Sequence, residues 1–205
     1  MIALCRTLWF VLVAAGVAAL LFVPASFAAE ASLDDWRAGP ASDAVMEIGQ
    51  RFDCIGAECP ADLSCLYALA PPRPPGSWPI DTAFMLDPKR MPWSDLEVWL
   101  VQKAKALRAD LADDPLVRRE HFVKRTEPAA VTWPSGQFVT RTYGLATKMR
   151  RYDLPLFLWS VKGRLRVMFC IQPPASEATR GARPVTDRLL AYLRRNDGKE
   201  DNSPE

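Results

Sequence analysis

The sequence predicts a single small α+β domain over residues 30–195, in which an antiparallel sheet of about four strands packs against two or more helices. Three observations predict this fold class. A helix-start signal opens residues 94–112, hairpin patterns occupy residues 131–143 and 154–171, and an amphipathic pattern covers about 186–195. Clustered cysteines add the expectation of a disulfide-tied helical segment at the N-terminal side of the sheet.

The N-terminal segment 1–29 has the pattern of a secretory signal peptide. One arginine precedes a continuous apolar run over residues 8–23, and small residues follow up to Ala28 and Ala29, where cleavage is expected. The alternative is an uncleaved membrane anchor, because residues 7–29 are long enough to span a bilayer. Both interpretations predict an exported protein, periplasmic or secreted.

Composition excludes several classes of protein. Of the 205 residues, 49% are hydrophobic and 24% are charged, and the net charge is +2, which is unlike a disordered chain or a nucleic-acid binder. The charge is unevenly distributed, since residues 30–63 carry eight acids and two bases, whereas residues 141–166 carry seven bases and one acid. The two segments either face each other or leave a basic face that binds an anionic partner.

The chain before the central helix is predicted to be helical in two places. Apolar residues repeat at helical spacing over residues 43–52, and a short second helix is expected over residues 62–69, after Pro60. The proline-rich run 70–76 cannot continue a helix and predicts a stiff connector.

The central helix has a well-defined predicted start and end. Ser94 and Glu97 form a capping box, and Trp93 and Val98 are spaced for a hydrophobic staple. Residues 113–115, two aspartates and a proline, end the helix after about 18 residues. A further short helix is expected over residues 116–123.

Two hairpins follow. The first flanks a three-residue turn at 134–136, and the second turns at Lys162 and Gly163, which fixes its register. The predicted cross-strand pairs of the second hairpin are Ser160 with Leu165, Leu158 with Val167 and Leu156 with Phe169 on an apolar core face, and Val161 with Arg164, Trp159 with Arg166 and Phe157 with Met168 on the other face. The final helix over about 186–195 precedes a polar tail, 196–205, predicted to be disordered.

Four cysteines remain after the predicted signal peptide: Cys54, Cys59, Cys65 and Cys170. In an exported chain these predict two disulfides, with Cys170 joined to one cysteine of the cluster and the other two joined to each other. Which cysteine pairs with Cys170 stays open. We expect no metal and no cofactor, although a periplasmic metal-handling factor built on the cysteine cluster is an alternative, despite the lack of C-x2-C spacing.

The sequence predicts no catalytic residues, and we expect a protein that is not an enzyme. His121 is the only histidine and lies among cations, and no G-x-S-x-G motif is present. The adjacent pairs Asp34–Asp35 and Asp113–Asp114 are typical of caps and turns. Their alternative interpretation is a small exported hydrolase that uses carboxylates on envelope glycans.

The basic and aromatic face of the second hairpin is the candidate binding site. It predicts a non-enzymatic accessory protein of the cell envelope that binds a protein partner with an acidic surface. Nucleic acid is not an expected partner, and membrane contact is expected only if the N-terminal segment stays uncleaved. The alternative is that this face is covered by a helix. The candidate binding residues are Trp159, Arg164 and Arg166 on the hairpin, with Lys148, Arg150 and Arg151 before it.

Overall fold

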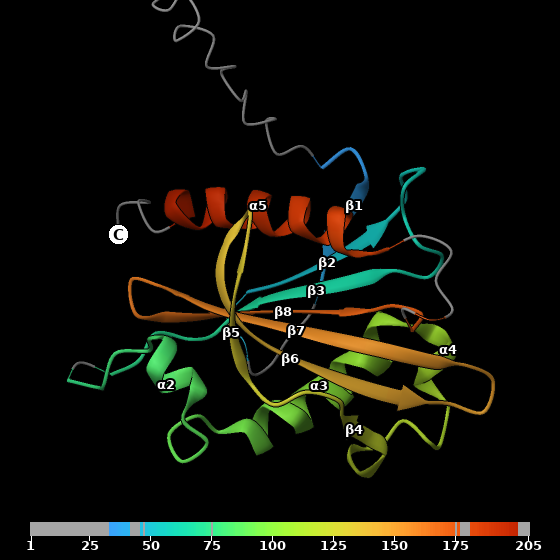
Figure 1. Cartoon of the computed structure of the whole chain (residues 1–205), viewed down its shortest axis with the longest axis horizontal. Coiled ribbons are helices and arrows are strands. Elements are labelled where there is room, and N and C mark those ends of the chain that lie inside the picture. The colour runs from blue at the N-terminus through green and yellow to red at the C-terminus, as the bar shows by residue number, and fades with distance from the viewer. Residues whose placement is uncertain are drawn as a thin grey trace, which may run out of the picture. The chain divides into compact units, whose positions relative to one another are not determined.

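In the computed structural model, the described residues all belong to one compact unit, residues 31–205. The predicted signal peptide, residues 1–29, lies outside the described residues. A sheet of eight antiparallel strands is covered by α5 on one face and by α3 and α4 on the other (Figure 1). The described residues are 33–41, 46, 48–74, 76–174, 176 and 181–200.

The strands follow the order β1-β2-β3-β8-β7-β6-β4, and β5 pairs with β6 beside β4. The strands are β1 (Trp36–Pro40), β2 (Ile48–Cys54), β3 (Ser64–Leu69), β4 (Phe122–Lys124), β5 (Ala129–Trp133), β6 (Gly136–Ala146), β7 (Arg151–Val161) and β8 (Arg164–Ile171). The helices are α2 (Thr82–Leu86), α3 (Trp93–Leu107), α4 (Ala109–Ala112), the 3-10 helix η2 (Arg119–His121) and α5 (Arg183–Glu200).

The prediction of about four strands is wrong. The two helices predicted before residue 70 are the strands β2 and β3, and β1 and β4 add two further strands. Residues 48–52 of the first predicted helix belong to β2, which lies between β1 and β3, so pairing with these two strands overrides the helical spacing. All six residues of β3 are buried, since the strand lies between β2 and β8 with helices over both faces. A strand covered on both faces lacks the alternation by which a half-buried strand is predicted.

The second hairpin is confirmed with the predicted register, including Trp159 opposite Arg166 and Leu158 opposite Val167. Lys162 and Gly163 have φ values of 49° and 78°, which a two-residue turn of type I′ requires. The first hairpin is also confirmed, but its turn contains two residues, because Gly136 already pairs with Trp133.

The central helix is confirmed, although its start and end differ from the prediction. Pro92 is its N-cap, and Ser94 donates to the carboxylate of Asp95 rather than capping the helix. The predicted capping residue Glu97 is buried, where its carboxylate lies 3.6 Å from Nη1 of Arg141. The helix ends at Arg108, which is extended, and α4 forms a separate turn.

The segment after α4 is only partly helical. Three residues form η2, and the chain then joins the sheet as β4, so the short helix predicted over residues 116–123 is wrong. Phe122 pairs with Leu145 of β6, a contact between distant parts of the sequence that local spacing does not reveal.

The final helix is confirmed and is longer than predicted. It continues to Glu200, so the expected disordered tail is corrected for residues 196–200, and residues 201–205 lie outside the described part. Its apolar side chains, among them Leu189 and Leu193, pack on the sheet face that carries Trp159.

Both predicted disulfides are present, and the preferred pairing scheme is confirmed. Cys65 joins Cys170 directly across β3 and β8, where both are fully buried, and Cys54 joins Cys59 at a partly exposed loop. Disulfides are typical of proteins that fold in an oxidising compartment, so the pairing supports export. Within the described ranges, no helix is both long and apolar enough to cross a membrane.

Candidate functional site

The predicted binding residues divide into two groups, and the first group is covered. Trp159 and Arg166 are neighbours as predicted, but their exposed fractions are only 2% and 0%, because α5 packs over them. Arg164 is partly buried and donates to the backbone oxygen of Ala70 at 3.2 Å. The open basic and aromatic face predicted for this hairpin is therefore part of the interior.

A buried carboxylate accounts for the position of Arg166. Asp197 of α5 is 2% exposed, and its Oδ1 lies 3.4 Å from Nε of Arg166. The same carboxylate accepts hydrogen bonds from the hydroxyl of Tyr67 and from Nε1 of Trp159, the latter at 2.8 Å. This cluster joins the C-terminal half of α5 to three neighbouring strands, which is a structural role.

The second group lies together at the turn between β6 and β7. Lys148, Arg150 and Arg151 are all exposed there, and Met149 between them is 89% exposed. We call residues 148–151 the β6–β7 turn. Its three cations are among the residues predicted from the sequence, whereas Met149 is not. The sequence signal for Met149 is an apolar residue within a turn between two strands.

The side chain of Thr147 fixes the backbone of this turn. Its Oγ1 accepts from the backbone N–H of Arg150 at 3.0 Å and from that of Met149 at 3.3 Å. The Thr147 N–H also donates to the Arg150 carbonyl at 2.8 Å. The turn therefore has a defined shape without a bound partner, which lowers the entropic cost of docking.

Asp114 attaches this turn to the loop after α4. Its carboxylate accepts from the backbone N–H of Leu116 at 2.8 Å and from that of Lys148 at 3.1 Å. These backbone hydrogen bonds, that of Leu116 first, lower the pKa of Asp114. A carboxyl group with a lowered pKa stays ionised and is poorly suited to act as a general acid.

The other features proposed for chemistry also have structural partners. Asp35 accepts from Nη2 of Arg188 at 2.6 Å, and Nδ1 of His121 lies 2.7 Å from the backbone oxygen of Leu116. Because the three clustered cysteines considered for metal binding, Cys54, Cys59 and Cys65, are all in disulfides, the metal-handling alternative loses its thiolate ligands.

A hollow of about 660 Å³ lies beside the β6–β7 turn, and Arg108 is among the residues that line it. Arg108 binds Asp110 through two hydrogen bonds, Nε to Oδ1 at 2.8 Å and Nη2 to Oδ2 at 3.1 Å. Its guanidinium also lies over the ring of Tyr152, 5.3 Å from the centroid. The charged side chains that line the hollow are Arg51, Arg108, Arg150, Asp62, Asp110 and Asp114.

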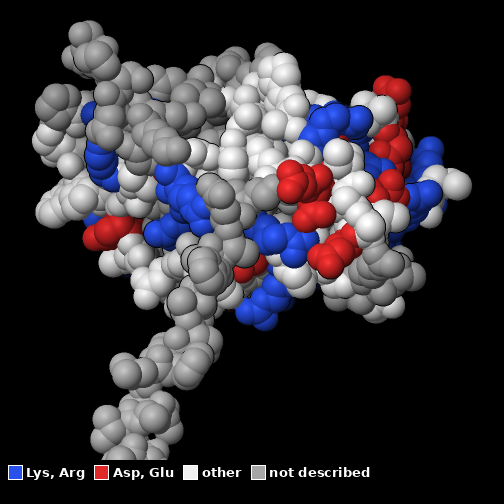
Figure 2. Space-filling model, turned by 90° about the horizontal axis from the view of Figure 1, so that it is seen from above, with Lys and Arg blue, Asp and Glu red and all other residues white. Residues whose placement is uncertain are grey.

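Ion pairs across the hollow connect the acidic and basic segments of the sequence. Asp62, from the acidic segment, pairs with Arg150 of the turn and lies 3.4 Å from Nη1 of Arg108. On the face seen in Figure 2, acidic and basic side chains are interspersed rather than gathered into separate halves. Lys148 and Arg151 form no ion pair within the described residues, so their charge is available to a partner.

Because of the hydroxyl of Tyr152, the folded state is expected to lose stability at alkaline pH. Burial, followed by a 2.7 Å hydrogen bond donated to Asp110, raises the pKa of Tyr152 to about 12 from 10.0. Its stabilising contribution is complete below pH 10 and is lost as the pH rises towards 12. As the pH is raised from 9 to about 11, the free energy of unfolding of Tyr152→Phe is therefore expected to fall less than that of the unmodified protein. Urea unfolding at several pH values measures this, and equal losses in both proteins would contradict it.

Comparisons with known proteins add little to this geometry. No protein-family model and no curated protein sequence matches the chain. A crystal structure of LpqN, described as involved in cell envelope biogenesis of Mycobacterium tuberculosis, aligns over 78% of this chain and 75% of that chain. The sequence identity is 14% and the TM-score is 0.34, so the likeness establishes neither a shared fold nor a shared function.

Proposed function

We propose that this chain is a non-enzymatic accessory protein of the cell envelope, located in the periplasm, that binds a protein partner with an acidic surface. The binding site is the β6–β7 turn. The observation that carries the proposal is the 89% exposed side chain of Met149, flanked by three cations in a turn that Thr147 and Asp114 hold in place.

The chemistry of the turn suits a protein surface. Methionine is flexible and polarisable, and it is favoured at surfaces that adapt to a partner. Lys148 and Arg151 supply positive charge that steers an acidic partner towards the turn, whereas Arg150 is already paired with Asp62. The partner we infer therefore has an apolar depression surrounded by carboxylates.

The location in the periplasm rests on two features of the chain. Residues 1–29 have the pattern of a signal peptide for export, and the two disulfides are typical of proteins in an oxidising compartment. A non-enzymatic role is supported by the structural partners of Asp35, Asp114 and His121.

Native mass spectrometry, without reductant, of the protein purified from the envelope of its own host tests this proposal. We expect a mature mass that lacks about 29 residues and four hydrogens, with a protein partner attached. The double variant Lys148→Glu/Arg151→Glu is expected to bind that partner at least tenfold more weakly, or by about 1.4 kcal/mol.

The matched control for this variant is Arg73→Glu/Arg90→Glu, which makes the same charge change at exposed residues elsewhere. It is expected to keep the partner. Equal affinity of the β6–β7 turn variant and the unmodified protein would show that the partner binds elsewhere and would overturn the proposal.

A further inference from the structure

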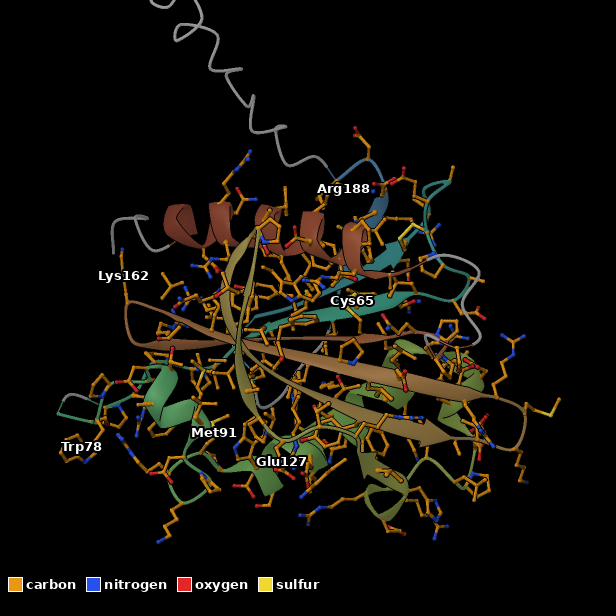
Figure 3. The ribbon with its side chains drawn as sticks, viewed as in Figure 1. Cys65, Trp78, Met91, Glu127, Lys162 and Arg188 are labelled. Atoms are coloured by element: carbon orange, nitrogen blue, oxygen red, sulfur yellow. A yellow bond between two sulfur atoms is a disulfide. The ribbon has the colours of Figure 1, made fainter. Side chains whose placement is uncertain are left out.

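A second exposed basic and aromatic surface is formed by the segment that connects β3 to α3 in the sequence, outside the site described above. We call it the Trp78 surface, and it consists of the exposed residues Arg73, Trp78, Lys89 and Arg90, whose two arginines lie over the buried ring of Phe84. Trp78 is 75% exposed, and Figure 3 shows its side chain projecting away from the ribbon. An indole combines an apolar body with a polar N–H and is therefore favoured at interfaces where one side is apolar and the other is wet.

Two arginines organise this surface. The guanidinium of Arg90 lies 5.7 Å from the ring centroid of Trp78 and 5.1 Å from that of Phe84. The guanidinium of Arg73 lies 5.3 Å from the Phe84 ring, and its Nη1 donates to the backbone oxygen of Trp78 at 2.7 Å. Neither arginine forms an ion pair with a described carboxylate. With Lys89, the surface carries three cations, and the two carboxylates nearby, Asp81 and Asp87, leave a net positive charge.

The backbone presents these side chains in a fixed arrangement. Prolines at 71, 72, 74 and 79 restrict the segment that carries Trp78. Asp81 caps α2 by accepting from the Phe84 N–H at 2.7 Å, and Asp87 accepts from the Lys89 N–H at 2.8 Å. Both acidic residues near the surface are therefore used as backbone acceptors.

The Trp78 surface and the β6–β7 turn lie at opposite ends of β7. Ile80 and Asp81 line a hollow together with Lys162 of the β7–β8 turn, and Figure 3 shows Trp78 and Lys162 at the same end of the molecule. The eleven residues of β7 at about 3.3 Å each span roughly 35 Å to its other end. A ligand at the Trp78 surface therefore leaves the β6–β7 turn free.

We propose that the Trp78 surface binds the surface of a membrane that contains anionic lipids. An indole is amphipathic and favours the boundary between lipid headgroups and acyl chains, and arginine and lysine are attracted to anionic headgroups. A projecting tryptophan suits a soft, flat surface, whereas peptides are recognised in grooves or along sheet edges. The chain would then contact a membrane even when residues 1–29 are cleaved.

Co-sedimentation with vesicles tests the proposal on the protein as its host produces it. We expect tighter binding to vesicles of phosphatidylcholine with phosphatidylglycerol than to phosphatidylcholine alone. Arg73→Glu/Arg90→Glu is expected to lower binding to the anionic vesicles at least tenfold, whereas Lys148→Glu/Arg151→Glu, with the same charge change, retains it. An uncleaved N-terminal segment would raise binding to vesicles with and without phosphatidylglycerol alike. The difference in binding between the two kinds of vesicle is therefore the result that tests the proposal.

Tryptophan fluorescence with lipids brominated on their acyl chains provides a second readout. Quenching of the unmodified protein is expected to exceed that of Trp78→Phe, because only the former places an indole at residue 78 in the bilayer interface. Equal quenching in both proteins would overturn the proposal. So would unchanged vesicle binding by Arg73→Glu/Arg90→Glu, or binding of polyglutamate at this surface without binding of anionic vesicles.

Discussion

Replacing Asp197 by alanine is expected to lower the free energy of unfolding by about 3–5 kcal/mol. Arg166 is fully buried, and the substitution removes the carboxylate of Asp197 from beside its guanidinium beneath α5. Tyr67 and Trp159 lose a hydrogen-bond acceptor at the same time. Urea unfolding followed by circular dichroism at neutral pH measures the change.

The matched control replaces both charges, as in Arg166→Met/Asp197→Leu. Removing both members of a buried ion pair is often close to neutral, so this double variant is expected to be more stable than Asp197→Ala. A loss below about 1 kcal/mol in Asp197→Ala would contradict the account, because it would mean that water reaches Arg166 when the end of α5 loosens.

The second large effect is expected from the buried disulfide. Cys65 and Cys170 are 105 residues apart, whereas Cys54 and Cys59 are five apart. In the chain-entropy account, cross-linking a loop of about 100 residues stabilises the folded state by about 4.7 kcal/mol, and a loop of about six residues by about 2 kcal/mol. Cys65→Ala/Cys170→Ala should therefore be destabilised more than twice as strongly as Cys54→Ala/Cys59→Ala.

Unfolding of both double variants in urea without reductant provides the comparison. The short disulfide is the internal control, since both variants lose two sulfurs and one cross-link. A larger loss in Cys54→Ala/Cys59→Ala would show that the local contacts of that loop, and not the entropy of the unfolded chain, dominate the stabilisation.

The parts of the fold that were predicted from sequence are those with strong local signals. The second hairpin was predicted with the correct register, because Lys162 and Gly163 permit a two-residue turn and the strands alternate around it. The central helix was predicted from its apolar face. The capping box there was misleading, since Glu97 is held by cations from β4 and β6 rather than by the helix start.

The strands β2 and β3 were not predicted because their structure depends on pairing with other strands, which local spacing does not show. β3 is buried over its whole length, and its pairing with β8 joins residues about one hundred positions apart. Without alternation, a short apolar segment gives no periodicity that separates a strand from a helix. In β2 the helical spacing of Ile48 and Phe52 favoured a helix, although the segment pairs with β1 and β3.

The candidate site was predicted only in part. The cations of the β6–β7 turn were found by counting charges, but Met149 was not, because exposure of an apolar residue is not visible in a sequence. Arg166 was assigned to an open face because its partner Asp197 lies in a polar segment expected to be disordered. The Trp78 surface depends on contacts of Arg73 and Arg90 that bring an apparent connector and α2 together.

Site-specific photo-cross-linking in the host tests the central claim most directly. A photoreactive amino acid at residue 149, in the β6–β7 turn, is compared with the same group at residue 123, where Val123 is 63% exposed in β4. We predict that the group at residue 149 cross-links to the acidic surface of one envelope protein. We also predict that Lys148→Glu/Arg151→Glu abolishes this cross-linked complex. Cross-linking of the same partner from residue 123 but not from residue 149 would contradict the proposed binding site.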